Sequence, residues 1–175
     1  MASSAMDMAI NMVGDQYGLP KGWLNQDFKK TASYSPKIAE YSVYYRTFSS
    51  VLQVCTLPAE YIAAMKLVSL REYKYDCSDV IGLAVEAQLS KERIEKAVSD
   101  LYGGMDKLTR QELAQKLLDE IYSHDDMKEL YQKYREYEKE NYGILKDLDS
   151  KYSGLLNTDN VGAVLKAARE KLHGE

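Results

Sequence analysis

The chain has 175 residues and a net charge of −4, which fits one ordinary domain or one domain with an appended helical segment. Its Lys and Arg residues form no run, so the composition excludes the large basic surface of a general nucleic-acid-binding domain. No stretch of about 18 apolar residues exists, and the cysteines and histidines lack zinc-ligand spacing. We therefore expect a cytoplasmic protein with no membrane segment and no zinc site.

The first predicted element is a helix over residues 5–17. Apolar side chains recur there every three to four residues, and Gly18 and Pro20 end the pattern. A loop at residues 22–25 and a short helix follow. Trp23 lies in this loop and is expected to anchor the hydrophobic core, because large aromatic side chains dominate core contacts.

Two strands follow, and no other segment of the sequence has a convincing strand pattern. Residues 41–48 and 51–57 are rich in aromatic and β-branched side chains, and Ser49-Ser50 can join them as a hairpin. Two strands alone are marginal in water and need more sheet or a helix to cover them. Packing in the core or at the sheet edge is the preferred role of the tyrosines here. Base stacking is the alternative for Tyr41, Tyr44 and Tyr45.

From Pro58 onward the pattern predicts only helices. Pro58 suits a first helical position, where its missing amide hydrogen costs nothing. Thr109 and Glu112 form a capping-box pattern, in which each side chain satisfies a free backbone amide. The predicted helices cover residues 58–73, 77–89, 91–101, 109–121, 125–148 and 160–172.

The helix that starts near residue 125 carries an apolar seam with alternating spacings of three and four. The seam continues for about three heptads, which is near the lower limit for a coiled coil. Two interpretations stay open: the seam packs on the rest of its own domain, or it forms a dimer contact. The seam residues are Met127, Leu130, Tyr134, Tyr137, Asn141, Ile144 and Leu148.

The order of elements predicts the fold class. One helix, two strands and then only helices indicate an α+β protein that is mostly helical. We divide the chain into residues 1–104, which contain the strands, and a helical C-terminal segment at residues 105–175.

Candidate chemistry is concentrated between residues 57 and 79. Lys66 lies inside an apolar helical run, where an ammonium is costly unless it reaches water or meets an anion such as a phosphate. Arg71 and Lys74 add positive charge nearby. Asp76 and Asp79 are three residues apart, so they share one face at the start of a helix. A structural alternative stays open, in which Asp76 caps that helix and Asp79 pairs with Lys74 or Arg71.

Four segments in a fixed order add a family resemblance. They are Leu-Pro-Lys-Gly-Trp-Leu-Asn at 19–25, Ser-Tyr-Ser-Pro at 33–36, Ala-Glu-Tyr-Ile-Ala-Ala-Met-Lys-Leu at 59–67 and Arg-Glu-Tyr-Lys-Tyr-Asp-Cys-Ser-Asp at 71–79. Together they resemble a bacterial family of nucleotidyltransferase-fold proteins, related to the toxin components of abortive-infection systems. The resemblance covers residues 2–102. It implies a partial nucleotidyltransferase-like α/β unit followed by a helical C-terminal bundle.

The resemblance also implies roles for individual residues. Lys66 is expected to grip the phosphates of a nucleotide, with Arg71 and Lys74 as further nucleotide-binding residues. Asp76 and Asp79 are expected to line the active site as catalytic residues. In the family, the cofactors are a nucleoside triphosphate and Mg²⁺, and an Asp-x-Asp pair holds the metal so that a hydroxyl can attack in line.

The sequence departs from the family pattern at the metal site. The family places a glycine-rich turn and the Asp-x-Asp strand before the helix at 5–17, where this chain has only Met1–Ser4. Asp147-Leu148-Asp149 lies at the wrong end of the chain and is interpreted as solvated charge. We therefore expect an incomplete Mg²⁺ site with no metal ligands assigned.

Two functional hypotheses follow. The first is a truncated or degenerate nucleotidyltransferase-like protein that binds nucleotide or phosphate without transfer activity of its own, unless a second chain completes it. The alternative is a protein–protein interaction or regulatory protein, either a toxin–antitoxin-like partner or a homodimer. The incomplete sheet supports the alternative, because an exposed strand edge recruits further strands.

Overall fold

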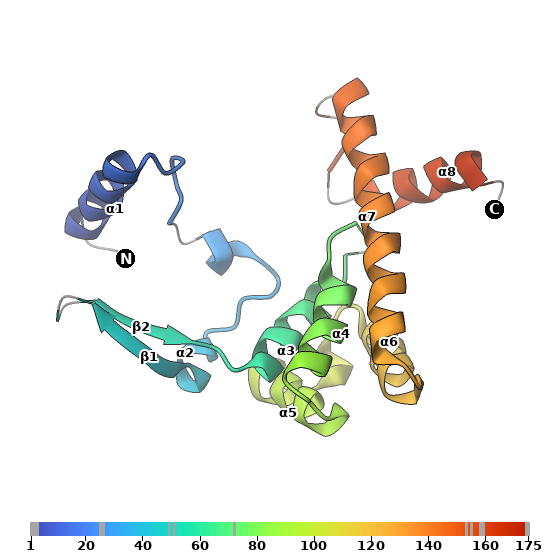
Figure 1. Ribbon diagram of the computed structural model, residues 1–175, viewed down its shortest axis with the longest axis horizontal. Coiled ribbons are helices and arrows are strands. Elements are labelled where there is room, and N and C mark those ends of the chain that lie inside the picture. The colour runs from blue at the N-terminus through green and yellow to red at the C-terminus, as the bar shows by residue number, and fades with distance from the viewer. Residues whose placement is uncertain are drawn as a thin grey trace. The chain divides into compact units, whose positions relative to one another are not determined.

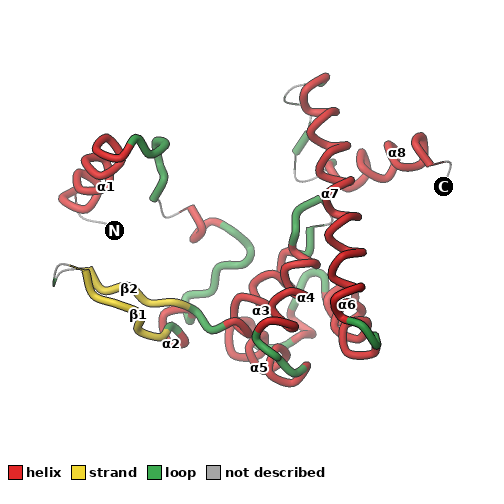
Figure 2. The backbone as a smooth tube through the Cα atoms, in the orientation of Figure 1, coloured by secondary structure: helices red, strands yellow, loops and turns green. Residues whose placement is uncertain are grey.

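The computed structural model describes residues 4–24, 27–48, 50, 52–71, 73–152, 154, 156–157 and 160–173. The chain divides into two compact units, Met1–Tyr34 and Ser35–Glu175. Figure 1 gives the order of the elements along the chain, and Figure 2 separates helices, strands and loops. Each unit is described by itself below.

The first unit consists of α1 (Ser4–Tyr17) and a short 3₁₀ helix, η1 (Asp27–Lys30). The Trp23 indole Nε1 donates a hydrogen bond to the Ile10 carbonyl, 3.1 Å away. The same ring covers Gly14, where an added Cβ would approach Nε1 to 3.2 Å. Trp23 therefore packs on the surface of α1 and remains 40% exposed. The prediction that Trp23 anchors the core is wrong.

The second unit begins with α2 (Ile38–Tyr41) and the hairpin of β1 (Val43–Phe48) and β2 (Leu52–Thr56), shown as yellow strands in Figure 2. The strands are antiparallel, with Val43 opposite Thr56 and an irregularity in the pairing between Tyr44 and Arg46. Ser49 and Val51 lie outside the described residues, so the predicted turn is described only at Ser50.

The tyrosines near the hairpin behave differently from one another. Tyr41 ends a helix instead of starting a strand, and its ring stacks on Tyr61 with 4.6 Å between centroids. Tyr44 and Tyr45, however, are exposed. For these two residues the core part of the prediction is wrong, because every residue of β1 is exposed; packing at the sheet edge and the alternative of base stacking stay predictions.

The remaining helices follow the predicted order with shifted ends. α3 begins one residue after Pro58 and ends where Leu70 adopts a left-handed backbone with φ of 34°. Gly103 ends α5 in the same left-handed region, as a glycine does without steric cost. Arg110 is the N-cap of α6 and makes no side-chain cap, so the capping box predicted at Thr109 is wrong. The bounds are α3 (Ala59–Ser69), α4 (Asp76–Glu86), α5 (Lys91–Tyr102), η2 (Met105–Lys107), α6 (Gln111–Ser123), α7 (Met127–Lys151) and α8 (Val161–His173).

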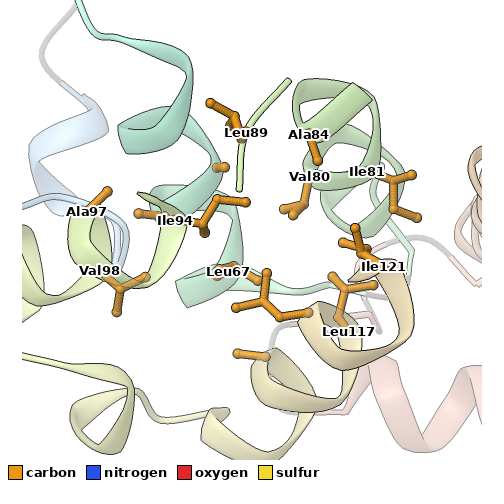
Figure 3. Close-up of a cluster of buried hydrophobic side chains, with 14 of the residues drawn as sticks. Leu67, Val80, Ile81, Ala84, Leu89, Ile94, Ala97, Val98, Leu117 and Ile121 are labelled. Atoms are coloured by element: carbon orange, nitrogen blue, oxygen red, sulfur yellow. The ribbon is translucent and has the colours of Figure 1, made fainter. Parts of the chain in front are cut away.

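One hydrophobic core is formed by α3, α4, α5 and α6 with the first turn of α7 (Figure 3). Each helix contributes apolar residues at three-to-four spacing, so its buried stripe faces the same centre. Leu101 and Leu117 both belong to this core, so the packing continues across the boundary placed at residue 104. The labelled side chains in Figure 3 are Leu67, Val80, Ile81, Ala84, Leu89, Ile94, Ala97, Val98, Leu117 and Ile121.

α7 lies alongside α4 in its first half and packs on α8 in its second half (Figure 1). Leu145 of α7 forms a small second cluster with Val161 and Leu165 of α8. The buried residues of α7 include two polar side chains, Glu138 and Asn141. Asp147 and Asp149 are exposed, as solvated charge should be.

The fold is thus mostly helical with one small antiparallel sheet, which confirms the α+β class at this level. No described helix combines the length and the apolar character needed to cross a bilayer.

Candidate functional site: charged residues at the first turn of α4

Asp76, the first residue of α4, is fully buried and surrounded by hydrogen-bond donors. Its Oδ2 accepts from the Arg71 backbone N at 3.0 Å and from Arg71 Nε at 2.8 Å. Its Oδ1 accepts from Arg71 Nη2 at 3.1 Å and Lys66 Nζ at 3.2 Å. Burial alone would raise the pKa of Asp76, but the Arg71 hydrogen bonds outweigh burial and hold the pKa below its usual range. The alternative in which Asp76 caps α4 is wrong, since the N-cap is Tyr75.

The turn between α3 and α4 explains why Arg71 reaches Asp76. Leu70 takes the left-handed conformation, and its N–H donates to the Lys66 carbonyl at 2.9 Å, which ends α3. The Leu70 carbonyl accepts from Arg110 Nη1 at 2.6 Å. The chain therefore reverses at Leu70 and points both the amide and the guanidinium of Arg71 at the start of α4.

Asp79, one turn later, occupies the more open side of the cluster. Its side chain is 36% exposed, and its Oδ2 lies 2.8 Å from Lys66 Nζ. Its Oδ1 lies 3.5 Å from Arg135 Nη1. Asp79 does pair structurally, but with Lys66 and Arg135 instead of the predicted Lys74 or Arg71.

Lys66 bridges the two aspartates. Its side chain is 33% exposed, so the ammonium touches both the buried Asp76 and the surface. Burial would lower the pKa of Lys66, but the hydrogen bonds and charges of Asp79 and Asp76 outweigh burial and raise it. Lys66 therefore stays fully charged at neutral pH.

α7 supplies two residues that the sequence did not single out. Glu138 is buried and accepts hydrogen bonds from the backbone N–H groups of Cys77 at 2.8 Å and Ser78 at 3.2 Å. This carboxylate caps the first turn of α4 from another helix. Burial, helped by the charge of Asp79, raises the pKa of Glu138 despite these hydrogen bonds.

Arg135 lies one turn before Glu138 on the same face of α7. Its Nη1 donates to Ser78 Oγ at 3.3 Å, and its guanidinium lies 3.7 Å from the centroid of the Tyr75 ring. The only sequence signal for these two residues is their three-residue spacing on the long helix. That signal is weak because the polar face of the helix consists mostly of charged residues, and many of them have the same spacing.

Lys74 is separate from the cluster. Its ammonium lies 5.6 Å from the centroid of the Tyr142 ring of α7. In the described ranges it forms no ion pair with Asp76 or Asp79. The structure thus brings together four of the five residues that the sequence selected, namely Lys66, Arg71, Asp76 and Asp79.

An open hollow lies beside the exposed part of the cluster. We call it the α3–α4–α7 hollow. Its volume is about 550 Å³, and Lys66 and Asp79 are part of its wall. A larger hollow of about 760 Å³ lies between α6 and α7, but its wall contains Cys77 and Glu138 instead of Lys66 and Asp79. Of these two hollows, only the α3–α4–α7 hollow is lined by Lys66, the lysine predicted to bind phosphate.

The charges determine what this site can do. Lys66, Arg71 and Arg135 face Asp76 and Asp79, so the cations exceed the carboxylates by one before Glu138 is counted. A Mg²⁺ ion does not fit these residues, since both aspartates are already paired with cations. The described part of the chain contains no group of three or more His, Cys, Asp or Glu side chains that could hold a metal. Lys66 is paired with both aspartates, and it is the cation of this cluster that also lines the α3–α4–α7 hollow.

Comparisons with protein-family models, with curated proteins and with solved structures found no match to this chain. The resemblance to nucleotidyltransferase-fold proteins therefore stays a prediction.

Proposed function

We propose that this chain is a nucleotidyltransferase-like protein that binds phosphate groups of a nucleotide at Lys66. One observation carries the proposal: the Lys66 ammonium is held between Asp76 and Asp79 at the wall of an open hollow, with one-third of its side chain exposed. The resemblance assigns the same lysine to the same task. No transfer step is proposed for these residues, because the Asp-x-Asp pair that would hold the metal is not among them.

The two ion pairs of Lys66 differ in how readily they open. Asp76 is fully buried and keeps Arg71 as its second partner, so its position does not depend on Lys66 alone. The Lys66–Asp79 pair is partly exposed, and such pairs contribute only about 0–1 kcal/mol. A phosphate carries more charge than a carboxylate and forms strong charge-assisted hydrogen bonds. It can therefore replace Asp79 at Lys66, while Asp79 keeps Arg135.

Titration calorimetry with ATP and with inorganic triphosphate, in chelator-treated buffer at low salt, tests the proposal. We expect Lys66→Ala to weaken binding of both probes by about tenfold or more, as loss of a charged hydrogen bond does. Lys96→Ala is the matched control, because Lys96 pairs with Asp100 on an exposed part of α5. Equal binding by wild type and Lys66→Ala would remove the proposal.

A second variant keeps the test valid if Lys66→Ala is poorly folded. Asp79→Asn removes the carboxylate that competes for Lys66 and leaves Lys66 in place. Because the proposal makes Asp79 a competitor of phosphate, Asp79→Asn should bind triphosphate more tightly than wild type. Weaker or unchanged binding would contradict the exchange of partners at Lys66.

Self-association is a second candidate function, favoured by the β1–β2 hairpin. Val43, Tyr44, Tyr45 and Phe48 of β1 are exposed, and a two-stranded ribbon with apolar side chains is marginal in water. Its open edges offer backbone groups for pairing with the hairpin of a second copy of the chain.

Sedimentation analysis over a wide concentration range tests this candidate. We expect a monomer–dimer equilibrium that Tyr45→Lys shifts toward monomer, because an edge lysine opposes strand pairing. Tyr152→Lys is the control, since Tyr152 is exposed but lies outside the hairpin. If the protein is a monomer at every concentration, self-association through the hairpin is ruled out.

A further inference from the structure

We infer that the α3–α4–α7 hollow takes a whole nucleoside phosphate, with the nucleoside lying against Tyr131 of α7. This inference rests on the proposed phosphate contact at Lys66 and adds the part of the ligand that a bare phosphate lacks. It assigns α7 a share of the binding site.

Three helices each contribute one stripe of residues to the hollow. α3 contributes two residues four apart, α4 contributes residues at three-to-four spacing, and α7 does the same. Residues at this spacing share one face of a helix, so the hollow is lined by one face of each of the three helices. The residues are Ile62 and Lys66 of α3, then Asp79, Gly82, Leu83, Val85 and Glu86 of α4, then Lys128, Tyr131 and Gln132 of α7.

The contacts between α4 and α7 fix the order of residues along the hollow. Arg135 meets Asp79, and Tyr131 meets Gly82 three residues further along α4. α7 therefore runs antiparallel to α4 here. Lys128, almost one turn before Tyr131, lies toward the end of the hollow where Glu86 stands. The hollow thus has Lys66 and Asp79 at one end, Tyr131 in the middle, and Glu86 with Lys128 at the other.

Gly82 brings the aromatic ring close to α4. A Cβ built at Gly82 would lie 3.3 Å from Tyr131 Cε2, which is a tight contact, so a larger residue at this position would push the ring slightly away from α4. The result is an aromatic surface in the wall, next to Leu83. Aromatic side chains of this kind bind bases by stacking, with little preference for one base.

The far end of the hollow offers polar groups without a described role. The side chains of Glu86, Lys128 and Gln132 are exposed, and across the described chain none of them forms a hydrogen bond or an ion pair. A carboxylate and an amide can bind sugar hydroxyls or a base edge. A volume of about 550 Å³ also falls within the usual range for small-molecule sites. A bare phosphate at Lys66 would leave these groups unused.

Titration calorimetry with ATP, inorganic triphosphate and adenosine tests the inference in the full chain. We expect wild type to bind ATP about tenfold more tightly than triphosphate, the size of one base–aromatic stack. Tyr131→Leu should abolish that preference, while Tyr131→Phe, which keeps the ring, should retain it. Tyr137→Leu is the matched control, because Tyr137 is a more exposed tyrosine of α7 at the other hollow.

The outcomes separate the inference from the function on which it rests. If ATP and triphosphate bind equally and both depend on Lys66, the nucleoside inference fails and the phosphate proposal stands. If Tyr131→Leu and Tyr137→Leu reduce ATP binding alike, the inference also fails. If neither ATP nor triphosphate binds at low salt, the phosphate proposal and the nucleoside inference fail together.

Discussion

Two buried carboxylates stabilise the first turn of α4, one on the side of α3 and one on the side of α7, and they have different partners. On the α3 side, the buried carboxylate of Asp76 belongs to α4 and faces the cations of Arg71 and Lys66. On the α7 side, the buried carboxylate of Glu138 faces two backbone N–H groups of α4. The pKa of Asp76 is lowered and that of Glu138 is raised. Asp76 and Glu138 are buried to a similar extent, so their different partners decide whether the ionised or the protonated form is favoured.

The largest expected effect comes from Asp76→Asn. This change leaves Arg71 and Lys66 without their shared partner, and breaking a buried pair costs several kcal/mol. Because both cations are partly exposed, we expect a loss of about 2–3 kcal/mol in the free energy of unfolding. Urea denaturation at pH 7 measures this loss. Asp119→Asn, at an exposed pair with Lys91, should cost far less, and equal losses would contradict the comparison.

Glu138→Ala should have the next largest effect. It uncaps two amides at the start of α4 and leaves a space where a buried side chain was, which should cost about 1–2 kcal/mol. Hydrogen exchange should accelerate at the amides of Cys77 and Ser78. Glu136→Ala, on the exposed face of α7, is the control. If exchange at these amides does not change, Glu138 is not their cap in solution.

Opposite pH dependence sharpens the comparison further. The pKa of Asp76 is lowered in the folded state, so its stabilisation is present above about pH 4 and is lost as the pH falls through the folded pKa. The pKa of Glu138 is raised, so its favourable contribution is present below about pH 4 and is lost as the pH rises through the folded pKa.

Two variants measure these signs. The stability difference between wild type and Asp76→Asn should shrink on acidification from pH 5 to pH 3. Glu138→Gln, which resembles the protonated acid, should gain stability relative to wild type as the pH rises from about 4 to 7. Parallel pH profiles for the two variants would show that their environments do not differ as described.

The smallest effect on stability is expected for Asp79→Asn. Its pairs with Lys66 and Arg135 are partly exposed, and such pairs contribute about 0–1 kcal/mol. A loss of stability as large as that of Asp76→Asn would make Asp79 part of the buried framework and would remove the basis for its exchange with phosphate.

The sequence predicted the order of elements because apolar spacing and Gly103 are local signals. It selected Lys66, Arg71, Asp76 and Asp79 correctly as neighbours, since an ammonium in an apolar run needs an anion. Lys74 was grouped with them because it is close to Arg71 and Asp76 in the sequence and because the resemblance made it a nucleotide-binding residue. Leu70 ends α3 four residues before Lys74, and a leucine in the left-handed region gives no sequence signal.

The other missed features depend on contacts distant in sequence. Glu138 and Arg135 look like ordinary surface residues of a charged helix, because nothing local places them beside α4. Tyr44 and Tyr45 have the composition of buried strand residues, but composition does not show whether another layer covers the strand that carries them.

Glu138 accepts hydrogen bonds from the backbone amides of Cys77 and Ser78, which precede it in the sequence by 61 and 60 residues. Contacts of such long range form only after the intervening chain has closed a large loop. A chain that ends before α7 would contain Lys66, Arg71, Asp76 and Asp79 and still leave those two amides uncapped. We therefore expect the amides in the first turn of α4 to become protected from hydrogen exchange late in refolding, when α7 packs against α4.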